Sequence, residues 1–183
     1  MTILKNVEIH FAKLIPERPS SKLNPENPTW EIQIRTKDKE QRKEWVAHNI
    51  RVKPVREDPK DDESPILHYQ ANLKKKSLTK EGKKSPPVEV VKSVKGQKVH
   101  VDPATIGNGS IANIRIFEYD YVYEGVKGKT AMLMGIQLVK HVMYVQAPME
   151  EFDDDVETET LDPADEGDEL STGGKASADD NEY

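Results

Sequence analysis

The sequence predicts a mainly-β protein: a small closed or half-closed antiparallel barrel with one helix, extra hairpins and an acidic tail. Apolar and polar residues alternate along roughly six or seven short segments, and turns rich in glycine, proline and asparagine separate them. Of the 183 residues, 33% are charged and only 35% hydrophobic, so part of the chain is expected to stay solvated. The strand spacing alone fits a five-stranded barrel and a sandwich equally well.

The first predicted strand covers residues 4–15, where Val7, Ile9 and Phe11 alternate with polar residues and are expected on one face. In the second strand, 29–35, the alternating apolar residues begin with Trp30. Residues 16–28 are predicted to form a loop between them. Further strands are predicted over residues 65–73, 88–91, 99–101, 110–123 and 129–146.

One helix is predicted over residues 37–51, with Thr36 as its N-cap and a modest apolar stripe around Trp45 and His48. Residues 52–64 contain prolines and an acidic cluster, and they are predicted to form a linker or surface excursion.

Charge is distributed unevenly along the chain. Residues 1–149 carry 26 Lys and Arg against 18 Asp and Glu, a balance of +8, whereas residues 150–183 carry one Lys against 15 acids, a balance of -14. We therefore predict a folded basic domain over 1–149 and a disordered acidic tail over 150–183. The tail ends on an aromatic residue among acids, which favours a partner-binding segment over a mere solubility tag; its candidate residues are Asp179, Asp180, Glu182 and Tyr183.

The predicted strand 110–123 carries the main candidate binding surface. At period two, one face presents two polar residues, Asn113 and Arg115, followed by four aromatic rings at Phe117, Tyr119, Tyr121 and Tyr123. A row of aromatic residues on one strand face often packs in the core or in an interface. Here an arginine and an asparagine lie on the same face, which favours a face exposed to solvent.

A solvated face with rings and nearby basic loops has the chemistry that single-stranded nucleic acid requires. Bases stack on aromatic rings whatever their sequence, and lysine or arginine binds the phosphates. Duplex reading is disfavoured, because the one predicted helix has no basic face. The remaining candidate contacts are Trp30, Tyr69, Arg35, Lys74, Lys75, Lys76, Lys83, Lys84, Lys92, Lys95, Lys98, Lys127 and Lys129.

Motifs for other functions are weak. Gly128, Lys129 and Thr130 look like the end of a P-loop, but Tyr123 stands where its first glycine should be. The sequence has no cysteine, and its five histidines lie at no metal-ligand spacing, so no enzyme, metal site or cofactor is expected. We also expect no secretory signal and no membrane span.

Several segments resemble the replication-type single-stranded DNA-binding proteins of bacteriophages. These are the hairpin Val90–Gly96, the glycine turn Gly107–Ser110 before the aromatic strand, the last strand over Leu138–Val145, and the acidic tail with its final aromatic. The resemblance covers residues 65–183 well, and the first 50 residues only in the order strand, strand, helix.

The resemblance implies a five-stranded OB-fold barrel that binds single-stranded DNA without sequence preference. It implies roles in phage DNA replication, recombination and repair in the host cytoplasm. It also implies a tail that recruits replication proteins (polymerase, helicase-primase), competes with DNA for the groove and accompanies homodimer formation. The alternative function from the residues is an acidic-tailed adaptor or chaperone without nucleic-acid binding, and an RNA-binding role stays open as well.

Overall fold

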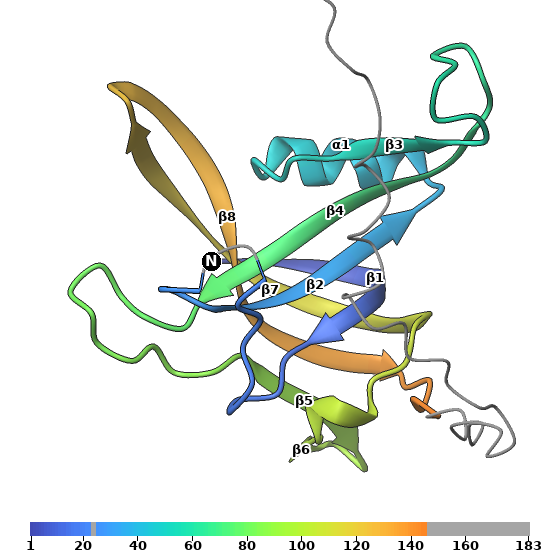
Figure 1. Cartoon of the computed structure of the whole chain (residues 1–183). Helices are drawn as coiled ribbons and strands as arrows, with labels where there is room; N and C mark the ends of the chain where they lie inside the picture. The colour runs from blue at the N-terminus through green and yellow to red at the C-terminus, as the bar shows by residue number, and fades with distance from the viewer. Residues whose placement is uncertain (23–24, 146–183) are drawn as a thin grey trace, which may run out of the picture. The chain divides into compact units, whose positions relative to one another are not determined.

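A computed structural model describes residues 1–22 and 25–145 of the chain, and it shows a mainly-β fold with one α-helix, as the sequence predicts (Figure 1). The chain divides into two units, Met1–Gln146 and Ala147–Tyr183. The elements of the described residues are β1 (Thr2–Lys13), β2 (Thr29–Thr36), α1 (Lys39–Ala47), β3 (Lys53–Arg56), β4 (Ile66–Lys76), β5 (Glu89–Val94), β6 (Gln97–His100), the 3-10 helix η1 (Pro103–Thr105), β7 (Ser110–Tyr123) and β8 (Val126–Lys140).

The predicted disordered tail lies outside the described residues, and so do its four candidate partner-binding residues. In the part of the chain that is described, no helix is long and apolar enough to cross a membrane. The same part contains no group of three or more His, Asp or Glu side chains placed to hold a metal ion.

The described strands form one eight-stranded sheet in the order β3-β4-β2-β1-β7-β8-β5-β6. Neighbouring strands are antiparallel except β5 and β8, which run parallel. The sheet curves so that β4 also comes close to β8, although the two are not neighbours in the hydrogen-bonded order. The predicted count of five barrel strands is therefore not confirmed, and the sheet is mixed where a purely antiparallel one was expected.

The hydrophobic core comes from alternate positions on the strands, because successive side chains of a strand point to opposite faces. On β2, Trp30, Ile32 and Ile34 are buried, while the polar residues between them are more exposed, as the alternation predicts. Core side chains on the other strands are Leu4, Val7, Ile9, Ala71, Leu73, Val90, Ala112, Ile114, Ile116, Leu133, Ile136 and Leu138.

Strand β1 departs from regular alternation at two bulges. Asn6 has φ 53° and Phe11 has φ 48°, and the strand register shifts at both places. The second bulge turns Phe11 out of the core, leaving the residue 54% exposed. The prediction that Phe11 shares a face with Val7 and Ile9 is therefore wrong, because a bulge adds one residue and reverses the alternation beyond it.

The helix is shorter than the predicted 37–51, and its N-cap is Asp38, whose side chain accepts a hydrogen bond from the Glu40 backbone N–H at 2.8 Å. Thr36 instead accepts from the backbone N–H of Asp38 at 3.0 Å, one step before the helix. Trp45 is fully buried and anchors the helix on the core. Residues 53–56 form the edge strand β3, where a linker was predicted.

Two-residue turns close both C-terminal hairpins. Lys95 and Gly96 connect β5 to β6, and Glu124 and Gly125 connect β7 to β8; all four residues have positive φ. This conformation matches the right-handed twist of the flanking strands. Because the second turn is so tight, β8 begins at Val126, three residues earlier than predicted.

Candidate nucleic-acid interface

The far ends of β7 and β8, residues 117–132, form a hairpin that extends away from the rest of the sheet (Figure 1). We call this hairpin the arm. Phe117, Tyr119, Tyr121 and Tyr123 are 40%, 37%, 42% and 68% exposed along it. The rings belong to alternate positions of β7, so they share the face that the sequence predicts, and that face is solvated. Lys127 and Lys129 lie on the partner strand of the arm, opposite Val122 and Asp120.

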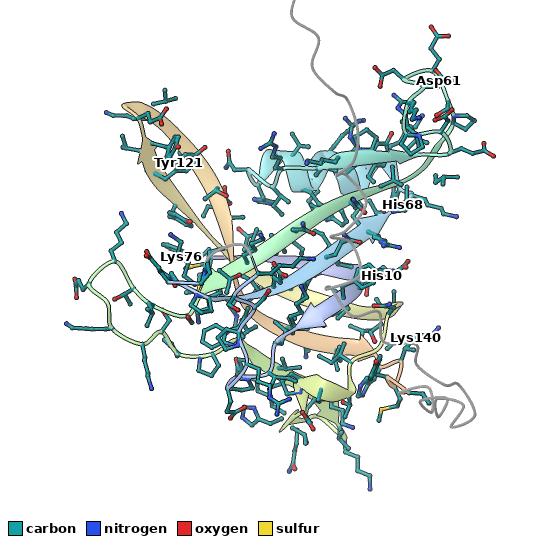
Figure 2. The ribbon with its side chains drawn as sticks, in the orientation of Figure 1. His10, Asp61, His68, Lys76, Tyr121 and Lys140 are labelled. Atoms are coloured by element: carbon teal, nitrogen blue, oxygen red, sulfur yellow. The ribbon has the colours of Figure 1, made fainter. Side chains whose placement is uncertain are left out.

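Tyr121 crosses the partner strand at a glycine. It stands opposite Gly128 in the register, and a Cβ atom built on Gly128 would lie only 2.6 Å from the phenol Cζ and Oη atoms. Only a residue without a side chain leaves room for the ring there. The same ring is visible on the arm in Figure 2, where Tyr121 is labelled. The arm thus holds this tyrosine across its surface as a platform.

The base of the arm is tied to the C-terminal end of α1 through Glu118, which lies on the opposite face of β7 from the rings. His48 Nδ1 is 3.0 Å from one carboxylate oxygen of Glu118, and Asn49 Nδ2 donates to the other at 2.7 Å. The hydrogen bond from His48, followed by that from Asn49, lowers the pKa of Glu118 below its ordinary value. These bonds set where the ring row stands relative to the sheet.

Further along the ring-bearing face of β7, a basic cluster surrounds one carboxylate. Glu89 pairs with Lys98 at 2.6 Å and with Arg115 at 3.5 Å, and the hydrogen bond from Lys98 is the main cause that lowers the pKa of Glu89. Arg115 and Lys98 also line an open hollow of about 230 Å³ next to Gly96. Two cations share one anion here, so the cluster keeps a net positive charge that attracts phosphate.

The other predicted basic residues differ in whether an acidic side chain lies close enough to balance their charge. Lys74 and Lys83 each have a carboxylate partner, Glu31 at 3.5 Å and Glu81 at 3.1 Å. Lys129 lies 4.0 Å from Asp120. Within the described residues, the predicted cations with no acidic side chain within 4.0 Å are Arg35, Lys75, Lys76, Lys84, Lys92, Lys95 and Lys127.

Three predicted contact residues are buried. Trp30 is 4% exposed and its indole N–H donates to the carbonyl of Ile15 at 3.1 Å. Tyr69 is 8% exposed, with the Arg42 guanidinium 4.7 Å from its ring centre. Lys75 points inward between core positions, and burial lowers the pKa of its amine. None of the three presents a surface to a ligand, so the interface that we propose below omits them.

A further exposed ring lies outside the arm, at Phe11, which the alternation predicted on one face with Val7 and Ile9. Phe11 lies beside Arg35, whose Cζ is 5.3 Å from the ring centre, on the outer face of β1, β2 and β4. We call this face the sheet surface; its polar residues include His10, Gln33, His68 and Asn72. Figure 2 labels His10 and His68, one near the end of β1 and the other near the start of β4. No signal in the sequence marks the bulge that exposes Phe11.

Two solved structures of phage proteins resemble this chain. The single-stranded DNA-binding protein of bacteriophage Enc34, in complex with single-stranded DNA, matches with a TM-score of 0.51 and 13% identity, over 76% of this chain and 86% of that one. The single-stranded DNA-binding protein gp2.5 of bacteriophage T7 matches with a TM-score of 0.44 and 19% identity, over 86% and 96% of the two chains. No family model and no curated protein matches the sequence. The match to the Enc34 protein confirms the resemblance predicted from the sequence, as a likeness of fold to a phage single-stranded DNA-binding protein.

Proposed function

We propose that the chain binds single-stranded DNA without sequence preference, as a binding protein and not as an enzyme. The observation that carries this proposal is the row of four exposed rings on one face of the arm. Four neighbouring rings in water need a physical reason, and unpaired bases are flat ligands that stack on them. The fold shared with the Enc34 protein, which was solved with single-stranded DNA, supports the same function.

In this mechanism the rings bind bases and the cations around them bind phosphates. Tyr119, Tyr121 and Tyr123 stack the bases, and the Arg115 cluster with Lys127 neutralises the backbone. Release of counterions from about 3–4 phosphates gives a log–log salt slope of about -2 to -3 for a single strand. Since stacking makes no use of base edges, affinity depends little on sequence.

We further propose that the sheet is an OB-type barrel whose third strand is interrupted. Strands β4 and β5 follow each other in the chain; β4 pairs with β2, and β5 pairs with β8. With β4 and β5 as two halves of one strand, the order closes into a ring of five: β1, β2, β4/β5, β8, β7 and back to β1. On this view the lysine-rich segment 77–88 is an insertion within the third strand, and β3 and β6 are added hairpin strands.

We propose roles in phage DNA replication, recombination and repair in the host cytoplasm, with residues 1–149 as the binding domain. The acidic segment 150–183, with its balance of -14, competes with DNA for the basic surface. A tethered segment of this length acts at an effective concentration of the order of mM. Asp179, Asp180, Glu182 and Tyr183 then contact replication proteins such as a polymerase or helicase-primase, and the protein forms a homodimer.

Titration of the intrinsic fluorescence tests the proposal. Full-length protein and protein lacking residues 150–183 are titrated with poly-dT, poly-rU and a duplex of equal length over a salt series. We expect quenching with poly-dT and little binding to the duplex, and tighter binding after truncation, most clearly at low salt. Binding to none of the three ligands contradicts single-stranded DNA binding and favours an adaptor. Equal binding to all three contradicts a preference for single-stranded DNA. A truncation without effect at low salt contradicts only the competition by the tail.

A further inference from the structure

We infer that the open edge of β6 is a docking site for an extended segment of another protein, one in which acidic residues alternate with apolar ones. The segment adds to the sheet as a further strand beyond β6. This inference goes beyond the proposed function, because its ligand is a protein and it uses backbone groups that the DNA interface does not need.

The two end strands of the sheet differ in how they are protected against further pairing. Strands β3 and β6 end the hydrogen-bonded order, and each has four residues. β3 contains Pro54, which has no N–H and so blunts an edge. β6 contains no proline, all of its residues are exposed, and it lies at the lower end of the sheet in Figure 1. The sheet is thus protected at one edge and open at the other.

The strand register decides which backbone groups of β6 point outward. The Val101 N–H donates to the Val90 carbonyl at 3.0 Å, so these two residues form a hydrogen-bonded pair just beyond the strand. Bonded and non-bonded pairs alternate along an antiparallel ladder. Val99 is therefore bonded to β5, whereas the N–H and C=O groups of Lys98 and His100 face away from it. No hydrogen bond within the described part of the chain uses these outward groups.

On one face of this hairpin, the side chains beside the open edge are basic. Lys98 and His100 share the face because they are two positions apart. Glu89 pairs with Lys98 at 2.6 Å and with Arg115 at 3.5 Å, so one anion stands against two cations. The hollow of about 230 Å³ beside Lys98 has no acidic residue among its described lining. Acidic side chains of a docked strand would lie opposite Lys98 and His100, where opposite charges stabilise a cross-strand pair.

The other face of the hairpin is apolar near the same edge. Val99 is 40% exposed and Val94 is 43% exposed, while Val101 packs against the core and is partly buried. An apolar side chain opposite Val99 would cover it and remove apolar surface from water. Successive side chains of a strand point to opposite faces, so the two faces together select a segment that alternates acidic and apolar residues.

Charge decides between such a partner and a second copy of this chain. A symmetric pairing of two β6 edges would place Lys98 of both copies close together on one face, and like charges opposite each other are destabilising. The hairpin over residues 89–100 carries three lysines, Lys92, Lys95 and Lys98, against one acid, Glu89. The lysine that disfavours pairing with an identical edge therefore favours an acidic strand.

Two variants at one position separate backbone docking from simple attraction by charge. His100→Pro removes an outward N–H and leaves the bonds between β5 and β6 in place, whereas His100→Ala removes the same side chain and keeps the N–H. Each full-length protein is titrated without DNA, at pH about 8 where histidine is neutral, with a labelled peptide of about seven residues that alternates Glu and Val. We expect His100→Pro to bind the peptide at least about 5-fold more weakly than His100→Ala, because one backbone hydrogen bond is lost.

His100→Ala should bind the peptide as the parent protein does, and both variants should bind a dT oligomer normally, which shows that they are folded. Amide hydrogen exchange in the parent protein gives a measurement that needs no variant. The N–H groups of Lys98 and His100 should exchange at least about 10-fold more slowly when the peptide is bound, and that of Val99 should change less.

Three results would overturn the docking site. The first is a parent protein that does not bind the alternating peptide. The second is equal peptide binding by His100→Pro and His100→Ala, or slowed exchange at the arm instead of at β6, because the peptide then acts only as a polyanion on the DNA-binding cations. The third is self-association of the parent that is lost in His100→Pro alone, which would assign the edge to a second copy. A parent protein that fails to bind dT refutes only the proposed function, since the peptide titration contains no DNA.

Discussion

Replacing Gly128 by alanine tests whether Tyr121 binds DNA from its position across the arm. The added Cβ atom would lie 2.6 Å from Cζ and Oη of the phenol and 2.8 Å from Cε1. Non-bonded carbon atoms prefer a separation of about 3.5–4.0 Å, so the ring must shift by about 1 Å or change rotamer. The contact involves the far end of a flexible side chain, and therefore the ring moves while the backbone of the arm keeps its place.

Stability is expected to change little in this variant, whereas affinity for DNA is expected to fall. Gly128 has no positive φ, and glycine inside a strand is destabilising by about 0.5–1 kcal/mol relative to alanine. That gain offsets an off-rotamer cost at Tyr121 of about 0.5–1.5 kcal/mol, so the free energy of unfolding stays within about 1 kcal/mol of the parent value. Stacking of one base is worth about 1–3 kcal/mol, and the loss of half of this energy lowers affinity for dT about 2- to 12-fold.

Gly135→Ala is the matched control on the same strand. A Cβ atom there would meet the Glu89 carbonyl oxygen at 3.4 Å, which is ordinary contact, and no aromatic ring. Both variants are titrated with a dT oligomer and melted thermally under the same conditions, together with Tyr121→Ala. We expect Gly128→Ala and Tyr121→Ala to bind more weakly than Gly135→Ala. If Gly128→Ala and Tyr121→Ala both bind as the parent does, Tyr121 is not part of the interface and our interpretation of the arm is refuted.

Two further predictions concern charge. Glu118→Gln weakens the hydrogen bond to His48, so thermal unfolding at pH 7 should begin at a lower temperature. The pKa of Glu118 is lowered in the folded protein, so the carboxylate stabilises the fold above the ordinary carboxyl pKa. The difference in stability between variant and parent should therefore vanish as pH falls below about 4. A difference that persists at low pH contradicts this account of the Glu118 hydrogen bonds. Lys76→Ala and Lys84→Ala should each reduce the salt slope of dT binding by about 0.7. Lys83→Ala should change the slope less, because the charge of Lys83 is balanced by Glu81. Equal slopes in all three variants would mean that the phosphates bind elsewhere.

The order of the strands along the chain was predictable, because a strand with one buried face repeats every two residues. This period identified the strand 29–35 almost to its ends, and it placed the arm rings on a face opposite Ile114 and Ile116. The single helix was predicted too, but two residues too early, since both Thr36 and Asp38 have side chains that can cap.

The departures have a common cause in long-range pairing. Residues 53–56 have no clear strand pattern, and they form β3 because β4 offers them an unpaired edge. Trp30 and Tyr69 were predicted to contact DNA as aromatic residues near basic ones, but both occupy core-facing positions. Burial of such a side chain depends on which strands surround it, and a local sequence pattern does not contain that information.

By itself, the sequence determined the mainly-β class, the separation of basic and acidic charge, and the row of rings on β7, because these follow from composition and from a period of two. Only the tertiary structure decided the parallel pairing of β5 with β8, the extension of the arm from the sheet, and the exposure of Phe11 beside Arg35. Each of these depends on contacts between residues far apart in the chain, such as the bond from the Phe11 N–H to Asn108. A bulge held by a side chain 97 residues away is a property of the folded sheet, and the local sequence around Phe11 does not specify it.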